Sequence, residues 1–366
     1  MTPIAFFVSP HGFGHAARAA AVANALAARH PAIHVHVFTR VPRWFFKESL
    51  VAGFSYHPCE SDVGLVQASP LVEDPVATLE RLEASPWSDP GAVDTLASAV
   101  LGLGCRLVIA DVSPLGLRVA ARARLPSVLV ENFTWDWIYD RMPAAPAALR
   151  RLGRAMAGDF ASAGLTIAAE PVCEPLAGSV AVPPVARAPR LSREAMRREL
   201  GVPDSAPMVV ASMGGIGWDY GRLERLASPT DDTWFVVPGG AGSVCHRGRV
   251  VMLPFHSRYY HPDLMAAADV VIGKLGYSTV AEASRAGISI AYVARPGFPE
   301  SPVLARFVER HLNARELDRE AFESGDWLPV VKDLVAGKRR PPARGDGAAA
   351  AAAAIEARFP EVFGSV

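Results

Sequence analysis

The sequence predicts an α/β protein built from two consecutive Rossmann-like domains that face each other across a cleft. Short apolar runs of strand length alternate with segments of helical composition, as in a parallel sheet with crossover helices. The alternation begins again after a proline-rich segment near the middle of the chain. A length of 366 residues, with 50% hydrophobic residues, is sufficient for two cores.

The first domain is expected over residues 1–185. Its sequence repeats the order strand, helix, strand, which makes neighbouring strands parallel. The predicted strands are Ile4–Ser9, Ile33–Arg40, Leu107–Asp111 and Ser127–Glu131, and the predicted helices are Ala16–Arg29, Pro114–Arg124 and Ala145–Ala161. A ligand site is expected at the carboxyl ends of these strands.

The second domain is expected over residues 186–344, after a segment (Val180–Leu191) whose prolines predict an extended linker. Ser192 is placed to cap a new helix. The predicted strands are Met208–Ser212, Trp234–Val237, Arg249–Leu253, Val270–Ile272 and Ser289–Val293, with one helix starting at Pro262 and another spanning Tyr277–Ala286. The alanine-rich tail, residues 345–366, is expected to form a closing helix over Gly345–Phe359 that packs on the first domain.

The composition excludes several function classes. Lys plus Arg and Asp plus Glu both number 37, so no excess of basic charge favours nucleic acid or an acidic membrane as a partner. No apolar stretch has the ~20 residues of a transmembrane helix, and no signal peptide is expected. The four cysteines are far apart, which predicts reduced, buried thiols and no metal site. We therefore expect a cytoplasmic protein with small-molecule partners.

A candidate base follows the first predicted strand. The segment Ser9–His15 places glycines at a strand-to-helix turn without completing the dinucleotide fingerprint. The helix dipole disfavours the charged form of His15 in the first turn, so this side chain is suited to accept a proton; a packed or capping histidine is the alternative. Asp111 ends another strand and is placed either to orient His15 or to cap the helix near Pro114.

Two segments of the second half have features of a phosphate site. Gly214 and Gly215 follow a predicted strand, where they permit close approach of a diphosphate or form a simple tight turn. The segment Asp269–Ala283 runs from a strand through a glycine-rich loop into a helix, although it is not a Walker loop. Its candidate diphosphate ligands are Lys274, Ser278, Thr279 and backbone N–H groups, and Glu282 is a candidate acceptor for ribose hydroxyls.

Taken together, these segments resemble GT-B glycosyltransferases of the MurG-like group, and more closely the N-terminal glycosyltransferase-like region of plant L-arabinokinases. The resemblance covers about Ile4 to His311. It rests on HGFGHAARAAAVANAL, ADVSPL and VENFTWDWIYD in the first half, and on MLPFHSRYYHPDLMAAADVVIGKLGYSTVAEA and FPESPVL in the second. It implies a GT-B fold and inverting, metal-independent transfer of a hexosyl or N-acetylhexosaminyl group from a nucleoside diphosphate sugar, with a UDP-sugar favoured, to an acceptor hydroxyl.

The resemblance also implies roles for individual residues. His15 is the base, with Asp111 behind it. The donor-binding positions are Gly276, Tyr277, Ser278 and Thr279 at the diphosphate, Glu282 at the ribose, Phe255 and His256 beside the base, and Glu300 at the sugar hydroxyls. The positions near the acceptor are Asn132, Trp135, Asp136 and Tyr139. The aromatic residues Trp87, Trp135, Trp137 and Tyr139 are expected either to stack on a sugar or to fill the core.

Other activities stay open or are disfavoured. The sequence contains no DxD motif, which argues against a metal-dependent GT-A enzyme. It also has no phosphate loop of the GHMP kinase type, so sugar kinase activity is not implied. Two alternatives remain, a non-catalytic sugar-nucleotide binding module and a nucleotide-sugar 2-epimerase. Asp111 and Glu131 are the acid/base candidates for the epimerase.

Overall fold

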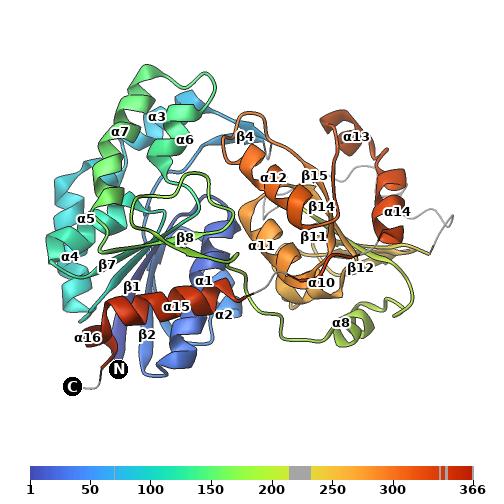
Figure 1. The fold of residues 1–366 in the computed structure, drawn as a ribbon, viewed down its shortest axis with the longest axis horizontal. Coiled ribbons are helices and arrows are strands. Elements are labelled where there is room, and N and C mark those ends of the chain that lie inside the picture. Colours follow the sequence, from blue (N-terminus) through green and yellow to red (C-terminus); the bar gives the residue numbers. More distant parts are fainter. Residues whose placement is uncertain (70, 214–231, 338, 343–344, 365–366) are drawn as a thin grey trace. The chain divides into compact units, whose positions relative to one another are not determined.

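The computed structural model describes residues 1–69, 71–213, 232–337, 339–342 and 345–364. The chain divides into two compact units (Figure 1). Unit 1 comprises Met1–Arg187, Gly297–Glu300 and Gly345–Val366, and unit 2 comprises Ala188–Pro296 and Ser301–Arg344. Among the described residues each unit contains a seven-stranded sheet with helices packed on it, which confirms an α/β fold of two Rossmann-like domains.

The sheet of unit 1 is parallel, in the order β3-β2-β1-β6-β7-β8-β9. Its strands are β1 (Thr2–Val8), β2 (Ile33–Thr39), β3 (Gly53–Pro58), β6 (Val108–Asp111), β7 (Ser127–Glu131), β8 (Leu165–Ala169) and β9 (Val180–Val182). The chain runs outward from β1 to β3 and then returns to β6 on the other side of β1. The strand order therefore reverses between β1 and β6, and ligands of doubly wound sheets bind beyond such a point.

Helices cover both faces of this sheet (Figure 1). One face carries α1 (Phe13–Arg29), α2 (Arg43–Ser49) and α15 (Gly347–Arg358). The other carries α4 (Pro90–Gly102), α5 (Pro114–Ala123) and α7 (Ala147–Ala161). The shorter elements of unit 1 are β4 (Gln67–Ser69), β5 (Val72–Glu73), α3 (Pro75–Glu83), the 3-10 helix η1 (Pro86–Ser88), α6 (Trp135–Arg141) and α16 (Pro360–Phe363).

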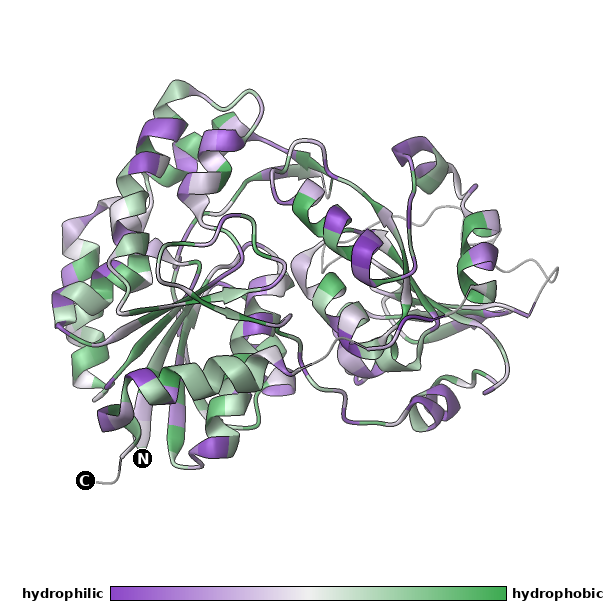
Figure 2. Ribbon diagram, viewed as in Figure 1, coloured by the Kyte–Doolittle hydropathy of each residue, from purple (hydrophilic) through white to green (hydrophobic). Residues whose placement is uncertain are grey.

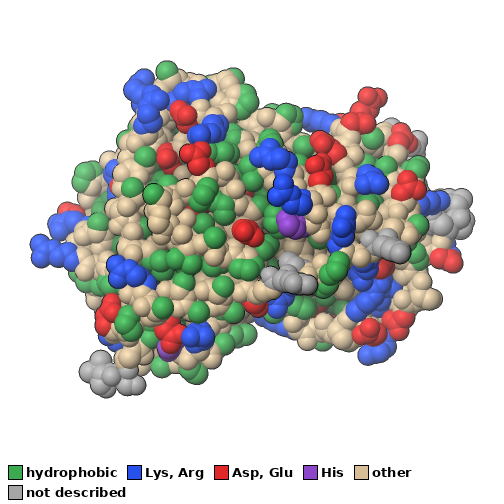
Figure 3. Space-filling view, viewed as in Figure 1, with side chains coloured by type: hydrophobic (Ala, Val, Ile, Leu, Met, Phe, Trp, Pro, Cys, Tyr) green, Lys and Arg blue, Asp and Glu red, His purple; other side chains and the backbone are tan. Residues whose placement is uncertain are grey.

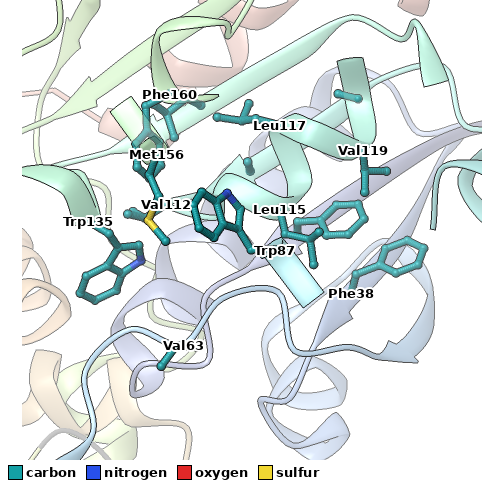
Figure 4. Close-up of a cluster of buried hydrophobic side chains, with 14 of the residues drawn as sticks. Phe38, Val63, Trp87, Val112, Leu115, Leu117, Val119, Trp135, Met156 and Phe160 are labelled. Carbon is teal, nitrogen blue, oxygen red and sulfur yellow. The ribbon is translucent and has the colours of Figure 1, made fainter. Parts of the chain in front are cut away.

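Successive side chains of the central strand β1 point to opposite faces of the sheet. Phe6 and Val8 lie against the alanine stripe of α1, whose small side chains let the helix lie close to the sheet. Phe7, the residue between them, belongs to a core cluster shared with α5 and α7. The members of this cluster drawn in Figure 4 include Phe38, Trp87, Leu115, Trp135, Met156 and Phe160.

The alanine-rich helix α15 packs along α1. Ala351 and Ala352 are fully buried, since a helix with methyl side chains can approach a neighbour closely. The side chain of Asp346 caps α15 by accepting hydrogen bonds from N–H groups in the first turn of the helix. The Nε of Arg29 on α1 donates to Oε2 of Glu356 at 2.7 Å. This helix therefore forms part of unit 1.

The sheet of unit 2 has the order β12-β13-β11-β10-β14-β15-β16. Its strands are β10 (Met208–Ser212), β11 (Trp234–Pro238), β12 (Cys245–Arg247), β13 (Val250–Leu253), β14 (Val270–Lys274), β15 (Ser289–Val293) and β16 (Ala314–Glu316). The edge strand β12 is antiparallel to β13, and the other described pairs are parallel. The strand order of unit 2 reverses between β10 and β14.

The described helices of unit 2 are α8 (Arg193–Leu200), α10 (His261–Ala267), α11 (Tyr277–Ala286), α12 (Ser301–His311), α13 (Arg319–Ser324) and α14 (Leu328–Ala336). The predicted cap of α8 is confirmed, because Ser192 Oγ accepts from the N–H of Ala195. In Figure 2 the strands of both units are mainly hydrophobic, whereas α8 is largely hydrophilic. The buried strands of the two sheets thus account for the continuous apolar runs in the sequence.

Two expectations need correction. Val180–Val182, which was expected in an extended linker, forms strand β9 and pairs with β8. The four cysteines are not all buried: Cys59 and Cys105 are, whereas Cys173 and Cys245 are half-buried. Burial raises the pKa of the Cys59 thiol to about 11 and that of Cys105 to about 12, so both thiols stay protonated at neutral pH.

Both basic and acidic side chains occur on the visible surface of each unit (Figure 3). Within the described ranges, no helix combines the length and the apolar character needed to cross a bilayer. The same residues contain no group of three or more His, Cys, Asp or Glu side chains arranged to hold a metal ion.

Candidate active site

A buried polar network lies in unit 1 where the strand order reverses. His15 Nδ1 is 2.9 Å from Asp111 Oδ1. Arg18 donates to both carboxylate oxygens, with Nε 2.9 Å from Oδ2 and Nη2 2.7 Å from Oδ1. Burial alone would raise the pKa of Asp111, but Arg18 and His15 outweigh it and the pKa is lowered. Asp111 is therefore an ionised carboxylate held by two partners.

Two residues with positive φ shape the backbone around this network. Gly12, the N-cap of α1, has a φ of 75°, which turns the chain from β1 into the helix. His15 and Arg18 then lie one helical turn apart, on a common face. Val112, directly after Asp111, has a φ of 54° and is fully buried. A β-branched residue in this conformation is strained by roughly 1–3 kcal/mol, and such strain clusters at functional sites.

Asp111 does not cap the helix that follows it. Helix α5 begins at Pro114, and its cap is Ser113, whose Oγ accepts from the N–H of Gly116 at 3.2 Å. Both oxygens of Asp111 are instead engaged by His15 and Arg18. The alternative interpretation of Asp111 as a helix cap is therefore wrong.

The contact with Asp111 selects one tautomer of His15. A carboxylate only accepts hydrogen bonds, so Nδ1 carries a proton, and in the neutral ring Nε2 is then the nitrogen with the lone pair. Arg18 Nη2 lies further from Nδ1, at 3.4 Å, and no hydrogen bond joins Nε2 to the described part of the chain. The ring centroid lies 5.8 Å from that of Phe133 and 6.1 Å from that of Trp135. His15 thus has the tautomer that a general base requires.

Sequence reasoning missed Arg18, although the signal was present. Arg18 follows His15 by three residues in an alanine-rich helix and is 1% exposed, and a buried arginine is normally paired. Its Nη1 donates to Asn132 Oδ1 at 2.5 Å, and Asn132 Nδ2 donates to Glu300 Oε1 at 2.6 Å. The structure therefore places Glu300, expected at the donor sugar, next to Asn132 within unit 1.

Two further carboxyl groups are buried in unit 1. Glu131, at the end of β7, is fully buried, and neither of its oxygens has a hydrogen-bond partner among the described residues. Burial raises the pKa of Glu131 to about 7. Asp62 accepts from Ser9 Oγ at 2.9 Å and from Trp135 Nε1 at 3.0 Å, and burial raises its pKa to about 7 as well. No motif marked Asp62 in the sequence.

Replacing Glu131 with glutamine is expected to flatten the pH dependence of stability. The pKa rises from 4.5 to about 7 on folding, so between these values the folded protein binds more protons and stability falls as pH rises. The full loss, reached above the folded pKa, is at most about 3 kcal/mol. Urea unfolding of both proteins at about pH 5 and about pH 8 measures this change. Equal changes with pH in wild type and Glu131→Gln would contradict the assignment.

The aromatic residues considered for sugar stacking mostly fill the core of unit 1. Trp87, Trp135 and Tyr139 are all buried. Their polar atoms have partners inside unit 1: Trp87 Nε1 donates to Asp159 Oδ2 at 2.7 Å, and Tyr139 Oη donates to the Gly64 carbonyl at 2.8 Å. Trp137 is half-buried, and its Nε1 donates to Glu174 Oε2 at 2.8 Å. Of the two alternatives for these side chains, the structure therefore supports core filling for Trp87, Trp135 and Tyr139.

In unit 2, helix α11 begins directly after β14, where the strand order reverses. Gly273 has a φ of 152°, and a Cβ there would lie 1.9 Å from the Ser212 carbonyl oxygen, so this close approach of β14 to β10 requires glycine. The N-cap of α11, Gly276, has no side chain that could cap the helix, and the first turn has no acidic residue, so the helix N-terminus is electropositive. The predicted positions gathered at this junction are Lys274, Gly276, Tyr277, Ser278 and Thr279.

Glu282 lies one turn further along α11 and is 3% exposed. Its Oε2 accepts from His261 Nδ1 at 2.8 Å, and His261 Nε2 lies 3.4 Å from Ser212 Oγ. Sequence reasoning missed His261, because no spacing rule connects it with a glutamate 21 residues away on another helix. Phe255, which is 46% exposed, and His256 lie in the loop after β13. Gly214 and Gly215 lie outside the described residues.

Comparison with known proteins places this geometry in context. No protein-family model matches the chain. Over 344 residues the chain is 31% identical to the L-arabinokinase of Arabidopsis thaliana, an alignment that covers 90% of this chain and 32% of that protein. The chain therefore spans about a third of the length of the curated relative that it matches.

Several solved structures share the fold at low sequence identity. The calicheamicin glycosyltransferase CalG4 has a TM-score of 0.63 at 18% identity, covering 99% of each chain. The spinosyn forosaminyltransferase SpnP has a TM-score of 0.58 at 15% identity, covering 99% of this chain and 95% of that one. MurG of Acinetobacter baumannii has a TM-score of 0.55 at 15% identity, covering 98% and 100%. The chain therefore has the GT-B fold of glycosyltransferases such as MurG, and its sequence is similar to about a third of a plant L-arabinokinase.

Proposed function

We propose that the chain is a cytoplasmic, inverting and metal-independent glycosyltransferase. It moves a hexosyl or N-acetylhexosaminyl group from a nucleoside diphosphate sugar, with a UDP-sugar favoured, to an acceptor hydroxyl. The observation that carries this proposal is the His15–Asp111 pair at the strand reversal of unit 1, in a chain with the GT-B fold. A neutral imidazole with a fixed tautomer is what deprotonation of an alcohol requires.

In this mechanism the acceptor hydroxyl donates a hydrogen bond to Nε2 of His15. The acceptor oxygen forms a bond to the anomeric carbon while its proton moves to Nε2, and the bond from that carbon to the diphosphate oxygen breaks. Attack opposite to the leaving group inverts the anomeric configuration. Asp111 holds the imidazole and stabilises the imidazolium, while Arg18 keeps Asp111 in place.

The nucleoside diphosphate leaves as an anion, so it needs electrostatic stabilisation. The proposal assigns this role to the N-terminus of α11, with the hydroxyls of Ser278 and Thr279 and the ammonium of Lys274. These groups supply positive potential and hydrogen-bond donors without a metal ion. Glu282 is assigned to the ribose hydroxyls, and Phe255 and His256 to the base.

The chemistry of the buried carboxyls favours transfer over 2-epimerisation. An epimerase needs carboxyls that can move protons, with Asp111 and Glu131 as the candidates. Asp111 accepts hydrogen bonds from Arg18 and His15, and these two residues lower its pKa. Asp111 is therefore ionised and is a poor proton donor.

Of the two candidates, only Glu131 has a pKa near neutrality, at about 7. The pKa of Asp62 is also about 7, but its two oxygens accept hydrogen bonds from Ser9 and Trp135. One carboxyl without such partners among the described residues supports the transferase proposal better than an epimerase with two acid/base groups.

A nucleoside diphosphate is expected to raise the melting temperature. A ligand at 100 times its dissociation constant adds about 2.7 kcal/mol of stability to the folded state. Thermal unfolding with UDP, GDP and TDP identifies the base, with the matching nucleoside monophosphates as controls for the second phosphate. The same measurements in EDTA are expected to give equal shifts, because protein groups replace the cation.

Incubation with a panel of nucleotide sugars and sugar acceptors then tests transfer. Diphosphate released only when an acceptor is present supports the proposal. Binding without turnover for every acceptor would identify a non-catalytic module. Conversion of the donor in the absence of an acceptor would identify an epimerase. No thermal shift with any nucleoside diphosphate would overturn the proposal.

A further inference from the structure

Four consecutive hydrogen bonds connect the candidate base with a distant part of the sequence. The five side chains are, in order, His15, Asp111, Arg18, Asn132 and Glu300. The joined atoms are 2.5–2.9 Å apart, and none of the five residues is more than 7% exposed. Because water hardly reaches these groups, each of them depends on its neighbours in the series for its orientation.

Asn132 lies between a guanidinium and a carboxyl group, and its amide fits there in one orientation only. A guanidinium only donates hydrogen bonds, so the atom 2.5 Å from Arg18 Nη1 is the amide oxygen. The amide nitrogen then faces Glu300 and donates to Oε1 at 2.6 Å. Asn132 is 0% exposed. Both ends of its side chain are therefore used to join Arg18 to Glu300.

Glu300 belongs to a short segment that unit 1 takes from the second half of the chain. Residues 297–300 are part of unit 1, although the residues on either side of them are part of unit 2. Phe298 of this segment is 2% exposed, and its ring centroid lies 5.9 Å from that of Phe133. The consecutive residues Asn132 and Phe133 therefore hold the segment with one polar and one apolar contact.

We infer that Asn132 is a positioning residue for the base, which makes the orientation of His15 depend on the contact between Asn132 and Glu300. This inference rests on the proposed function, since it concerns how the base of that reaction is held. The amide oxygen of Asn132 fixes Nη1 of Arg18, and the other two guanidinium nitrogens hold Asp111. A guanidinium is planar and rigid, so a shift at Nη1 also moves the nitrogens that orient Asp111.

The test introduces a second carboxyl group beside Glu300. Asn132→Asp keeps the shape of the side chain, but a carboxyl oxygen now faces Oε1 of Glu300 at the distance of a hydrogen bond. Two carboxyl groups this close share one proton, and the contact breaks when that proton is lost as pH rises. We expect the ratio of wild-type to variant kcat to rise from about threefold or less at about pH 6 to about tenfold or more at about pH 8.

A second substitution shows whether Glu300 transmits this effect. When Asn132→Asp is combined with Glu300→Gln, the new amide nitrogen donates to the new carboxylate, so the hydrogen bond is kept with donor and acceptor exchanged. The reference for this double variant is Glu300→Gln alone, which corrects for any other role of Glu300. The ratio of kcat between these two proteins is expected to be the same at both pH values, because no pair of carboxyl groups is present.

The state of the imidazole can be measured without a substrate. Nitrogen-15 NMR distinguishes a ring protonated at Nδ1 from one protonated at Nε2, and comparison with His15→Ala assigns the signals of His15. The neutral ring is expected to carry its proton on Nδ1 in wild type and to become a mixture of tautomers in Asn132→Asp at about pH 8. If Asn132→Asp does not fold, Glu300→Met removes the acceptor of the amide instead, and a mixture is expected at both pH values.

Asn24→Asp is the matched control, because Asn24 on α1 also uses both ends of its amide. Its Nδ2 donates to the Ser49 carbonyl at 2.7 Å, and its Oδ1 accepts from the N–H of Val51 at 2.9 Å. The ratio of wild-type to Asn24→Asp kcat is expected to be the same at both pH values. The charged and titratable groups around the altered pair are the same in wild type and variants, so their own titration largely cancels in these ratios: His15, Arg18, Glu73, Asp111 and Glu131.

The outcomes decide the inference and the proposed function separately. A loss of kcat in Asn132→Asp that grows with pH, disappears in the Glu300→Gln background and accompanies mixed tautomers of His15 supports the inference. A ratio that is the same at both pH values, or an unchanged tautomer, overturns it. A growing loss that remains in the Glu300→Gln background also overturns it, since the new charge then acts on Arg18 directly. An equal trend in Asn24→Asp overturns it as well, because general damage would explain the loss.

Failure of the proposed function has a different signature. If wild type transfers no sugar from any donor, the proposed function fails. The NMR measurement then still decides whether Asn132 positions His15, because it needs no turnover.

Discussion

Replacing His15 with alanine is expected to lower kcat by roughly two to four orders of magnitude while leaving donor affinity nearly intact. The imidazole is the group that takes the acceptor proton in the proposed mechanism, and its Nδ1 is committed to Asp111 at 2.9 Å. The donor contacts assigned to α11 are not changed by this substitution. Steady-state kinetics with the donor identified by the melting-temperature panel gives kcat, and calorimetry gives the donor dissociation constant.

His246→Ala is the matched control, because it removes an exposed imidazole from β12. Its turnover is expected to equal that of wild type. Wild-type turnover in His15→Ala would remove His15 from the mechanism. A loss of donor affinity equal to the loss of kcat/KM would show that His15 serves binding and not proton transfer.

Replacing Arg18 with methionine is expected to destabilise the protein by about 3–5 kcal/mol, the usual cost of leaving a buried charge without its partner. Arg18 and Asp111 are each 1% exposed, and two hydrogen bonds join them. Methionine fills a similar volume but cannot pair with the carboxylate. Urea unfolding followed by circular dichroism measures the change.

A double-mutant cycle tests whether this loss of stability comes from the unpaired charge. Arg18→Met combined with Asp111→Leu removes both charges and is expected to recover most of the lost stability, since a buried ion pair contributes little over an apolar pair of similar volume. The exposed pair of Arg122 and Asp94 is the control, and Arg122→Met is expected to have little effect because solvent screens that pair. A small effect of Arg18→Met, equal to that of Arg122→Met, would show that the network is not held by charge.

The strands that could be predicted from the sequence are those buried on both faces. The predicted ranges Ser127–Glu131, Met208–Ser212 and Ser289–Val293 match β7, β10 and β15 to the residue. A strand covered by helices on both sides must be apolar along its whole length, and such a run is visible in the sequence. In unit 1 the strands β3, β8 and β9 were missed, because some of their side chains are half-buried or exposed and their composition is mixed.

Local sequence also marks His15 and Asp111, because each follows or ends an apolar strand and the carboxyl ends of parallel strands meet at one edge of a sheet. It marks the helix start at Tyr277 in the same way. The hydrogen-bond partners of these groups are distant in the sequence and meet them only in the folded chain. Arg18 lies 93 residues from Asp111, and His261 lies 21 residues from Glu282.

The sequence by itself therefore determined the fold class, the buried strands and the strand ends that carry polar groups. Only the tertiary structure decided which of these groups meet: Arg18 with Asp111, and His261 with Glu282. The physical reason is that hydrophobic periodicity records whether a residue is buried, whereas contacts between polar side chains follow from the order in which strands and helices are placed side by side. That order arises when the whole sheet forms, and no local spacing in the chain encodes it.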